Sequence, residues 1–234
     1  MGLFGTRKGD SAYGLARRLF NAALPAVLVV AAGVLAMSTG GALAREPVRI
    51  LALGDSLSAG YGLPQSAGFT EQLQKALRDR GHAVTIINAG VSGDTTAGGL
   101  ARLDWALADK PDAAIVELGA NDMLRGLDPA AARANLDAIL KRMKDRGIPV
   151  LLTGMYASPG LGRTYAESFN AMYPALAEKY AVLLYPFFLD GVATDPALNQ
   201  GDGIHPNAAG VAVIVERILP HVIRLIETAT SSKG

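Results

Sequence analysis

Short apolar runs alternate with amphipathic segments along the chain from residue 47 onward. Five of these runs have the length and the nearly continuous apolar character of buried strands. They span residues 48–53, 83–88, 113–118, 150–155 and 182–185. Strands that are apolar on both faces and separated by helices are typical of parallel sheets covered on both sides.

Helical periodicity is clearest over residues 129–146. Four apolar side chains there follow the i, i+3, i+4, i+7 rule: Leu136, Ile139, Leu140 and Met143. Asp128 predicts an N-cap before Pro129, and Gly147 predicts the end of the helix. The same pattern predicts helices over residues 70–80, 96–108, 165–180 and 207–219, and Pro220 is expected to break or kink the last one before residues 221–228 continue.

These alternating elements predict one α/β domain over residues 45–234. Right-handed crossovers between parallel strands place helices on both faces of the sheet. We therefore expect a three-layer α/β/α fold with a five-stranded parallel sheet.

The first 44 residues differ from the rest of the chain. Basic residues precede an apolar run over residues 24–37, and Ala42-Leu43-Ala44 follows it. This order is typical of a secretory signal peptide, which we expect to be cleaved after Ala44, leaving no stable membrane anchor. The apolar run is shorter than the ~20 residues that span a bilayer. Arg17-Arg18 leaves twin-arginine export open beside the general secretory route.

Charge and cysteine content narrow the function classes. Without residues 1–44 the chain has 18 basic and 20 acidic residues, since four of 22 and one of 21 are removed, and the net charge is −2. This balance argues against a nucleic-acid surface or a polybasic membrane patch. There is no cysteine, so no disulfide stabilises the exported domain. We expect a monomer that binds a small molecule.

Polar clusters follow several of the predicted strands. Gly54-Asp55-Ser56 follows the first strand, Asn88-Ala89-Gly90 the second and Gly119-Ala120-Asn121-Asp122 the third, and residues 202–205 lie beyond the fifth. Ligands of open α/β sheets bind at the carboxyl ends of the strands. We therefore expect all four clusters at one edge of the sheet.

Ser56 is the candidate nucleophile, although Asp55 and Ser56 are also typical of a turn that caps a helix. A serine needs a base, and the chain has three histidines. His82 precedes a strand at the opposite edge and His221 lies on the last helix, so His205 is the candidate base. Asp202 is its candidate partner, with Asp190 and Asp195 as alternatives.

Acyl transfer also needs donors for the developing oxyanion. The candidates are the backbone N–H groups of Ser56 and Gly90 and the side-chain amide of Asn121. Each has an ordinary alternative, since Gly90 is typical of a turn and Asn121 of a helix cap. Their combination is what favours catalysis.

The motifs Gly54-Asp55-Ser56-Leu57-Ser58, Gly90, Gly119-Ala120-Asn121-Asp122 and Asp202-Gly203-Ile204-His205-Pro206-Asn207 resemble the four blocks of the SGNH (GDSL) hydrolases. The chain resembles in particular the bacterial periplasmic branch of this family, whose members are multifunctional thioesterases, lysophospholipases and arylesterases. The resemblance implies a flavodoxin-like sheet of order 2-1-3-4-5. It assigns Ser56, His205 and Asp202 to the catalytic triad, and Ser56, Gly90 and Asn121 to the oxyanion hole.

The expected activity is metal-free and cofactor-free hydrolysis of aryl esters, acyl thioesters or lysophospholipids. We expect Asp55, Leu57 and Tyr156 to contact substrate. Further apolar side chains are candidates for an acyl site or for ordinary packing: Leu63, Phe69, Met123, Leu124 and Leu161. Two alternatives stay open, a carbohydrate O-acetylesterase and a flavodoxin-like binding module without catalysis. A phosphate-binding module is disfavoured because no lysine follows the glycines of residues 54–60.

Overall fold

Five parallel strands form one sheet in the part of the chain that the computed structural model describes, residues 1–3 and 46–231. They are β1 (Val48–Gly54), β2 (Val84–Gly90), β3 (Ala113–Glu117), β4 (Val150–Thr153) and β5 (Leu183–Tyr185). Their order is β2-β1-β3-β4-β5. The predicted parallel sheet and its order are confirmed.

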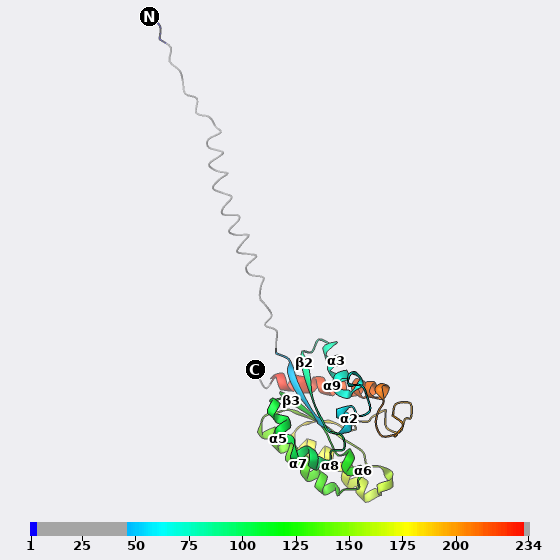
Figure 1. Ribbon diagram of the computed structural model, residues 1–234. Coiled ribbons are helices and arrows are strands. Elements are labelled where there is room, and N and C mark those ends of the chain that lie inside the picture. Colours follow the sequence, from blue (N-terminus) through cyan, green and yellow to red (C-terminus); the bar gives the residue numbers. More distant parts are fainter. Residues whose placement is uncertain (4–45, 232–234) are drawn as a thin grey trace. The chain divides into compact units, whose positions relative to one another are not determined.

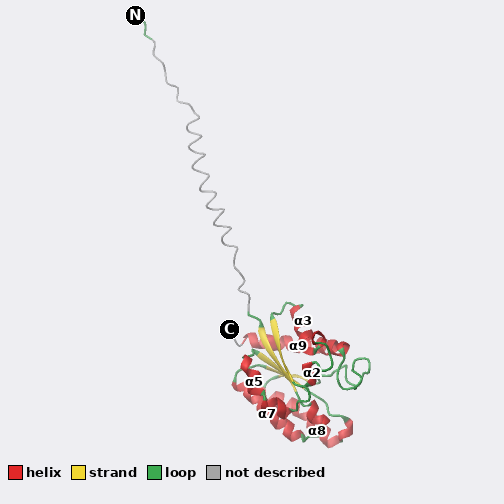
Figure 2. Cartoon of the chain, in the orientation of Figure 1, coloured by secondary structure: helices red, strands yellow, loops and turns green. Residues whose placement is uncertain are grey.

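Helices cover both faces of the sheet (Figures 1 and 2). On one face α3 (Phe69–Arg78) packs against α9 (Ala208–Ser231). On the other, α7 (Pro129–Asp145) packs against both α4 (Thr96–Ala101) and α8 (Arg163–Tyr180). The three-layer α/β/α arrangement is therefore confirmed.

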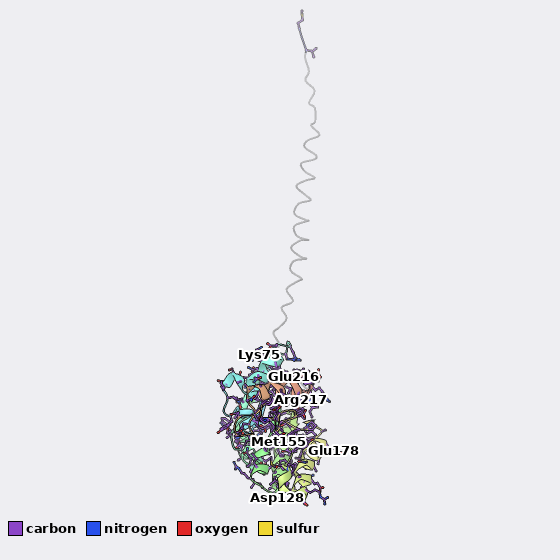
Figure 3. All side chains as sticks on the ribbon, turned by 90° about the vertical axis from the view of Figure 1, so that its right-hand side faces the viewer. Lys75, Asp128, Met155, Glu178, Glu216 and Arg217 are labelled. Carbon is purple, nitrogen blue, oxygen red and sulfur yellow. The ribbon has the colours of Figure 1, made fainter. Side chains whose placement is uncertain are left out.

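Figure 3 shows these layers from the side. Lys75 of α3 and Glu216 and Arg217 of α9 mark one helix layer, and Asp128 and Glu178 mark the other. Met155, which directly follows β4 and is 3% exposed, lies between them in this view. The charged residues labelled in this view thus lie in the outer layers, on either side of the sheet.

The central strands are buried on both faces, as their continuous apolar sequences predict. Every residue of β3 and β4 is buried, and so are the last five residues of β1. The buried side of α7 consists of Ala132, Leu136, Ile139, Leu140 and Met143, which includes all four residues of the predicted stripe. Burial of such side chains from water is the main stabilising term in a fold without disulfides.

The register of the strands aligns their carboxyl ends. Gly54 lies beside both Gly90 and Glu117, and Thr153 lies beside both Glu117 and Tyr185. One row of residues therefore runs across all five strands, and the polar loops leave the sheet from this row.

The helix predicted over residues 96–108 is interrupted. It consists of α4, α5 (Leu103–Ala106) and the 3₁₀ turn η2 (Leu107–Asp109). Arg102 separates α4 from α5 with φ −101° and ψ 5°, and its side chain binds the Gly54 carbonyl and Asp94. This long-range binding, together with Gly98 and Gly99 in α4, explains why a continuous helix does not form.

Pro220 does not divide the last helix, because α9 runs from Ala208 to Ser231 through it. Proline removes one helical hydrogen bond, yet Leu219 and Val222 on either side are buried. Their packing holds the two parts as one helix. Of the predicted break or kink, the break is therefore wrong, and the kink stays a prediction.

Short elements that the sequence pattern did not predict lie in the loops. They are α2 (Ser56–Ala59), η1 (Gln65–Ala67), α6 (Ala120–Leu124) and η3 (Pro159–Leu161). The predicted signal segment, residues 1–44, lies outside the described residues apart from the first three. Among the helices that are described, none combines the length and the apolar character needed to cross a membrane.

Candidate functional site

The turn after β1 presents Ser56. Asp55 caps α2 by accepting the Leu57 N–H at 3.0 Å, and Gly60 ends this helix in the left-handed conformation at φ 79°. Ser56 is the first residue of α2 and is partly exposed, whereas Asp55 and Leu57 are buried. The capping turn and the presentation of the candidate nucleophile are therefore one feature.

His205 lies against Ser56 although 149 residues separate them in the chain. Its Nε2 is 2.9 Å from Ser56 Oγ, and its Nδ1 is 2.7 Å from Asp202 Oδ2. Each ring nitrogen thus has the partner that a serine, histidine and aspartate triad requires.

The loop that carries Asp202 and His205 is fixed by its own hydrogen bonds. Asp202 Oδ1 accepts the N–H groups of Ile204 and His205, each at 3.0 Å. The hydrogen bond with His205 and these two backbone donors lower the pKa of Asp202 to about 2. Asp202 is therefore ionised at neutral pH, as a carboxylate that steadies an imidazolium must be.

The alternative residues have other partners. Asp190 forms an ion pair with Arg217, and Asp195 accepts the Ala197 N–H at 2.9 Å. His82 follows α3 on the amino side of β2, and the ring of His221 on α9 packs against Tyr185 with centroids 5.0 Å apart. The structure brings none of these four to Ser56 by any recorded contact.

Two residues that the sequence did not indicate support the histidine. The Tyr61 ring lies 4.6 Å from that of His205, centroid to centroid. Gln200 donates its side-chain amide to the Tyr61 and Pro206 carbonyls at 2.8 and 2.9 Å, and its backbone N–H to the His205 carbonyl at 2.7 Å. Gln200 therefore ties the loop after α2 to the loop that carries the base.

The backbone N–H of Gly90 is not free. It donates to Asn88 Oδ1 at 2.9 Å, and a Cβ added at Gly90 would lie 2.3 Å from the Ala59 nitrogen. This glycine lets α2 pack onto β2. Gly93 lies three residues later at φ 84°, and its N–H makes no hydrogen bond within the described part of the chain, so it is the better oxyanion candidate.

Asn121 joins three segments of the site. Its Nδ2 donates to the Asp94 carbonyl at 2.9 Å and to Asp55 Oδ2 at 3.1 Å. Asp94 also accepts from Arg102 Nε at 2.6 Å, and Arg102 Nη2 donates to the Gly54 carbonyl at 2.9 Å. Asn121 is therefore held beside the nucleophile turn. Asp94 and Arg102 are positioning residues that sequence periodicity does not reveal.

Two buried carboxyl groups lie behind the nucleophile turn. Burial raises the pKa of Asp55 to about 6, against the lowering effect of the Leu57 N–H. Because Asp55 has no exposed surface, it faces the protein interior, and the expected contact with substrate is not available to it. The second carboxyl belongs to Glu117, which the sequence analysis missed because it ends an apolar strand.

Apolar side chains surround the site at the carboxyl edge. Tyr156, after β4, is 50% exposed, and its ring lies 4.7 Å from that of Phe187. Other exposed members follow β2, follow β3 or lie beside His205: Val91, Leu124, Leu127 and Ile204. Leu57 and Phe69 are buried and line a small pocket next to Ser56, whereas Leu63, Met123 and Leu161 are partly exposed. Within the described residues no acidic, histidine or cysteine cluster suited to a metal ion occurs.

Known proteins resemble this chain over 68% to 76% of its length. The arylesterase of Vibrio mimicus is 41% identical over 177 residues, which cover 75% of this chain and 88% of the relative. The thioesterase 1/protease 1/lysophospholipase L1 of Escherichia coli strain K12 is 42% identical over 159 residues, covering 68% and 75%. The crystal structure of AlinE4, described as an SGNH-hydrolase family esterase, is 52% identical with a TM-score of 0.66, covering 76% and 96%.

A family model agrees with these relatives. The model of the GDSL-like Lipase/Acylhydrolase family matches residues 52–213, which include Ser56, Asn121 and His205. The resemblance seen in the four sequence motifs is thereby confirmed, and the chain belongs to the GDSL-like lipase/acylhydrolase family.

Proposed function

We propose that this protein is a serine esterase that cleaves carboxylic esters and thioesters, with Ser56, His205 and Asp202 as its triad. The observation that carries this proposal is the chain of two hydrogen bonds, 2.9 Å from Ser56 Oγ to His205 and 2.7 Å from His205 to Asp202. The neighbouring serine, Ser58, is buried and bonded to Glu117, so it is not available as the nucleophile.

The reaction proceeds in two steps. His205 Nε2 takes the proton of Ser56 while Oγ attacks the acyl carbon, and Asp202 stabilises the resulting imidazolium. The imidazolium then gives this proton to the leaving oxygen or sulfur, so that an alcohol or a thiol departs and the acyl group stays on Ser56. In the second step His205 takes a proton from a water molecule as the water oxygen attacks the acyl carbon. The bond from the acyl carbon to Ser56 Oγ then breaks, the imidazolium returns its proton to Oγ, and the carboxylic acid leaves.

The oxyanion is stabilised by the N–H groups of Ser56 and Gly93 and by Asn121 Nδ2. Gly93 replaces Gly90 in this proposal because the Gly90 N–H is already used. Asn121 holds two acceptors, Asp94 O and Asp55 Oδ2, and an oxyanion shares or displaces one of them. These hydrogen bonds hold the amide in place before the reaction, which reduces the reorganisation needed when the charge develops.

The substrate class follows from the apolar rim and from the relatives. Tyr156, Leu124, Val91 and Ile204 offer exposed apolar surface for an acyl or aryl group. The names of the relatives, arylesterase and thioesterase 1/protease 1/lysophospholipase L1, support aryl esters, acyl thioesters and lysophospholipids as substrates. An ester series of increasing chain length separates this class from an O-acetylesterase, which would hydrolyse acetyl esters alone.

We further propose that residues 1–44 are a signal peptide and that the protein is exported to the periplasm. Full-length protein made in a Gram-negative host is expected in the periplasmic fraction with Arg45 at its N-terminus, measured by mass spectrometry and N-terminal sequencing. Cytoplasmic protein that retains Met1 would contradict it. Replacement of both Arg17 and Arg18 by lysine blocks export only if the twin-arginine route is used.

Replacement of Ser56 by alanine tests the nucleophile. We expect kcat on p-nitrophenyl octanoate to fall by several orders of magnitude, since loss of the serine costs about 10⁶ in a comparable triad. Ser168→Ala, on the exposed surface of α8, is the control and should keep wild-type activity. A Ser56→Ala protein that retained most of its activity would refute the assignment.

Replacement of Asn121 by alanine tests the oxyanion donor. We expect kcat to fall by about 10²–10³ with a smaller change in KM, because the lost donor acts mainly on the transition state. Asn135→Ala is the matched control, since that amide donates to Thr96 Oγ1 and makes no hydrogen bond to Ser56 or His205. Equal losses of kcat in the two variants would argue against the proposed role.

The raised pKa of Asp55 predicts a pH dependence of stability. Native Asp55 keeps its proton up to about pH 6, whereas the unfolded chain loses it near 3.8, so stability falls as pH rises through this window. Asp55→Asn removes this contribution, which is on the order of 2–3 kcal/mol. The fall in Tm between pH 4 and pH 8 should therefore be smaller in Asp55→Asn than in the wild type. The exposed control Asp109→Asn should match the wild type, and an unchanged slope in Asp55→Asn would contradict the prediction.

A further inference from the structure

Glu117 is a fully buried carboxyl group at the end of a central strand. It is the last residue of β3, between Gly54 of β1 and Thr153 of β4 in the sheet register. A charged carboxylate in such a position is costly unless donors or cations compensate it. The groups around Glu117 therefore decide whether its side chain is protonated or ionised.

The contacts of Glu117 all lead to the nucleophile turn. Oε2 accepts from Ser58 Oγ at 2.9 Å and from the Asp55 N–H at 3.3 Å, on either side of Ser56. The absence of a side chain at Gly54 makes this possible, because a Cβ there would lie 2.1 Å from Ser58 Oγ and 2.6 Å from Glu117 Oε2. The glycine of the Gly-Asp-Ser motif thus provides the room in which Glu117 holds the turn.

No cation compensates Glu117 among the described residues. Arg102 directs its guanidinium to the Gly54 carbonyl and to Asp94, and the Tyr173 hydroxyl of α8 donates to the Leu118 carbonyl at 3.0 Å. Oε1 of Glu117 is buried and has no partner in this part of the chain. Two donors to one oxygen and none to the other leave a carboxylate poorly solvated.

The second buried carboxyl, Asp55, is better placed to carry a charge. It accepts the Leu57 N–H at 3.0 Å and Asn121 Nδ2 at 3.1 Å, and it is also attracted to His205. Two neighbouring carboxyls do not both ionise readily. Burial and the charge of Asp55 together raise the pKa of Glu117 well above its usual value.

We propose that Glu117 is a positioning residue of the esterase reaction, which works as a neutral carboxylic acid and holds the segment from Gly54 to Ser58 through Asp55 and Ser58. The inference rests on the proposed function. The neutral form accepts both hydrogen bonds through its carbonyl oxygen. It also adds no negative charge behind the site where the oxyanion develops.

Ionisation of Glu117 therefore opposes the reaction. A carboxylate there repels Asp55 and the oxyanion on Ser56, while its hydrogen bonds to the turn remain. Activity should accordingly fall on the alkaline side when Glu117 loses its proton. A group that acted only as packing would leave the pH profile unchanged.

Glutamine and leucine at position 117 separate these roles. Glu117→Gln keeps the acceptor and the neutrality, so kcat at pH 7 should stay near the wild-type value and the alkaline fall should disappear. Glu117→Leu removes the acceptor, and kcat should drop about tenfold to a hundredfold with little change in KM, as expected for misplaced reacting groups. Thr153→Val, at the neighbouring buried strand end, is the matched control and should behave like the wild type.

Infrared difference spectroscopy of the wild type against Glu117→Gln gives a readout independent of activity. At pH 7 we expect the carbonyl stretch of a protonated carboxyl, which the glutamine variant lacks. Three results would each overturn the proposal. The wild type could show a carboxylate band instead, Glu117→Gln could lose as much activity as Glu117→Leu, or the activity of the wild type and of Glu117→Gln could fall identically at alkaline pH. If the wild type itself hydrolysed no ester, the proposed function would fail, and the infrared band would still decide the state of Glu117.

Discussion

Parallel pairing of the strands in one register is the constraint on which the site depends. The row from Gly90 through Gly54, Glu117 and Thr153 to Tyr185 fixes where each strand stops. Because all five strands run the same way, every loop that follows them leaves at the same edge. Residues from distant parts of the chain, such as Ser56 and His205, meet there without a disulfide, since the chain has no cysteine.

Three connections convert this shared edge into a fixed geometry. Asn121 joins the loop after β3 to Asp55 and to the Asp94 carbonyl, Arg102 joins Asp94 to Gly54, and Gln200 joins the base-bearing loop to Tyr61. Each is a polar side chain that binds a backbone group or a carboxylate in another segment. The positions of the loops are therefore set by hydrogen bonds, and the apolar core sets only the strands from which they start.

The sequence predicted the features that depend on local pattern or on motif. Continuous apolar runs predicted all five strands. Asp128 and Gly147 predicted the beginning and the end of α7. It did not predict the break at Arg102, because that break depends on a contact with Gly54 that is 48 residues away. The continuity of α9 through Pro220 likewise depends on burial against the sheet.

The candidate site shows the same division. Ser56, Asp202, His205 and Asn121 were found from residue type and loop position, and their recorded contacts bring them together. Gly90 was named as a donor because sequence does not show that Asn88 occupies its N–H, and Gly93 was not among the candidates. Glu117 was missed since an acidic residue at the end of an apolar run has no periodic signature. The roles of Gly93 and Glu117 thus depend on backbone hydrogen bonds and on burial, which the sequence does not show.

The stability of the loop that carries His205 affects how the protein loses activity under mild denaturing conditions. Asp202 orients His205 through hydrogen bonds that span only four residues, and Gln200 fixes this loop to Tyr61. Segments stabilised mainly by exposed hydrogen bonds open at lower free energy than the buried sheet. Heat or mild denaturant should thus abolish esterase activity while the strands and helices are still folded. Cooling should restore the activity, because only the small loop has to refold onto an intact domain.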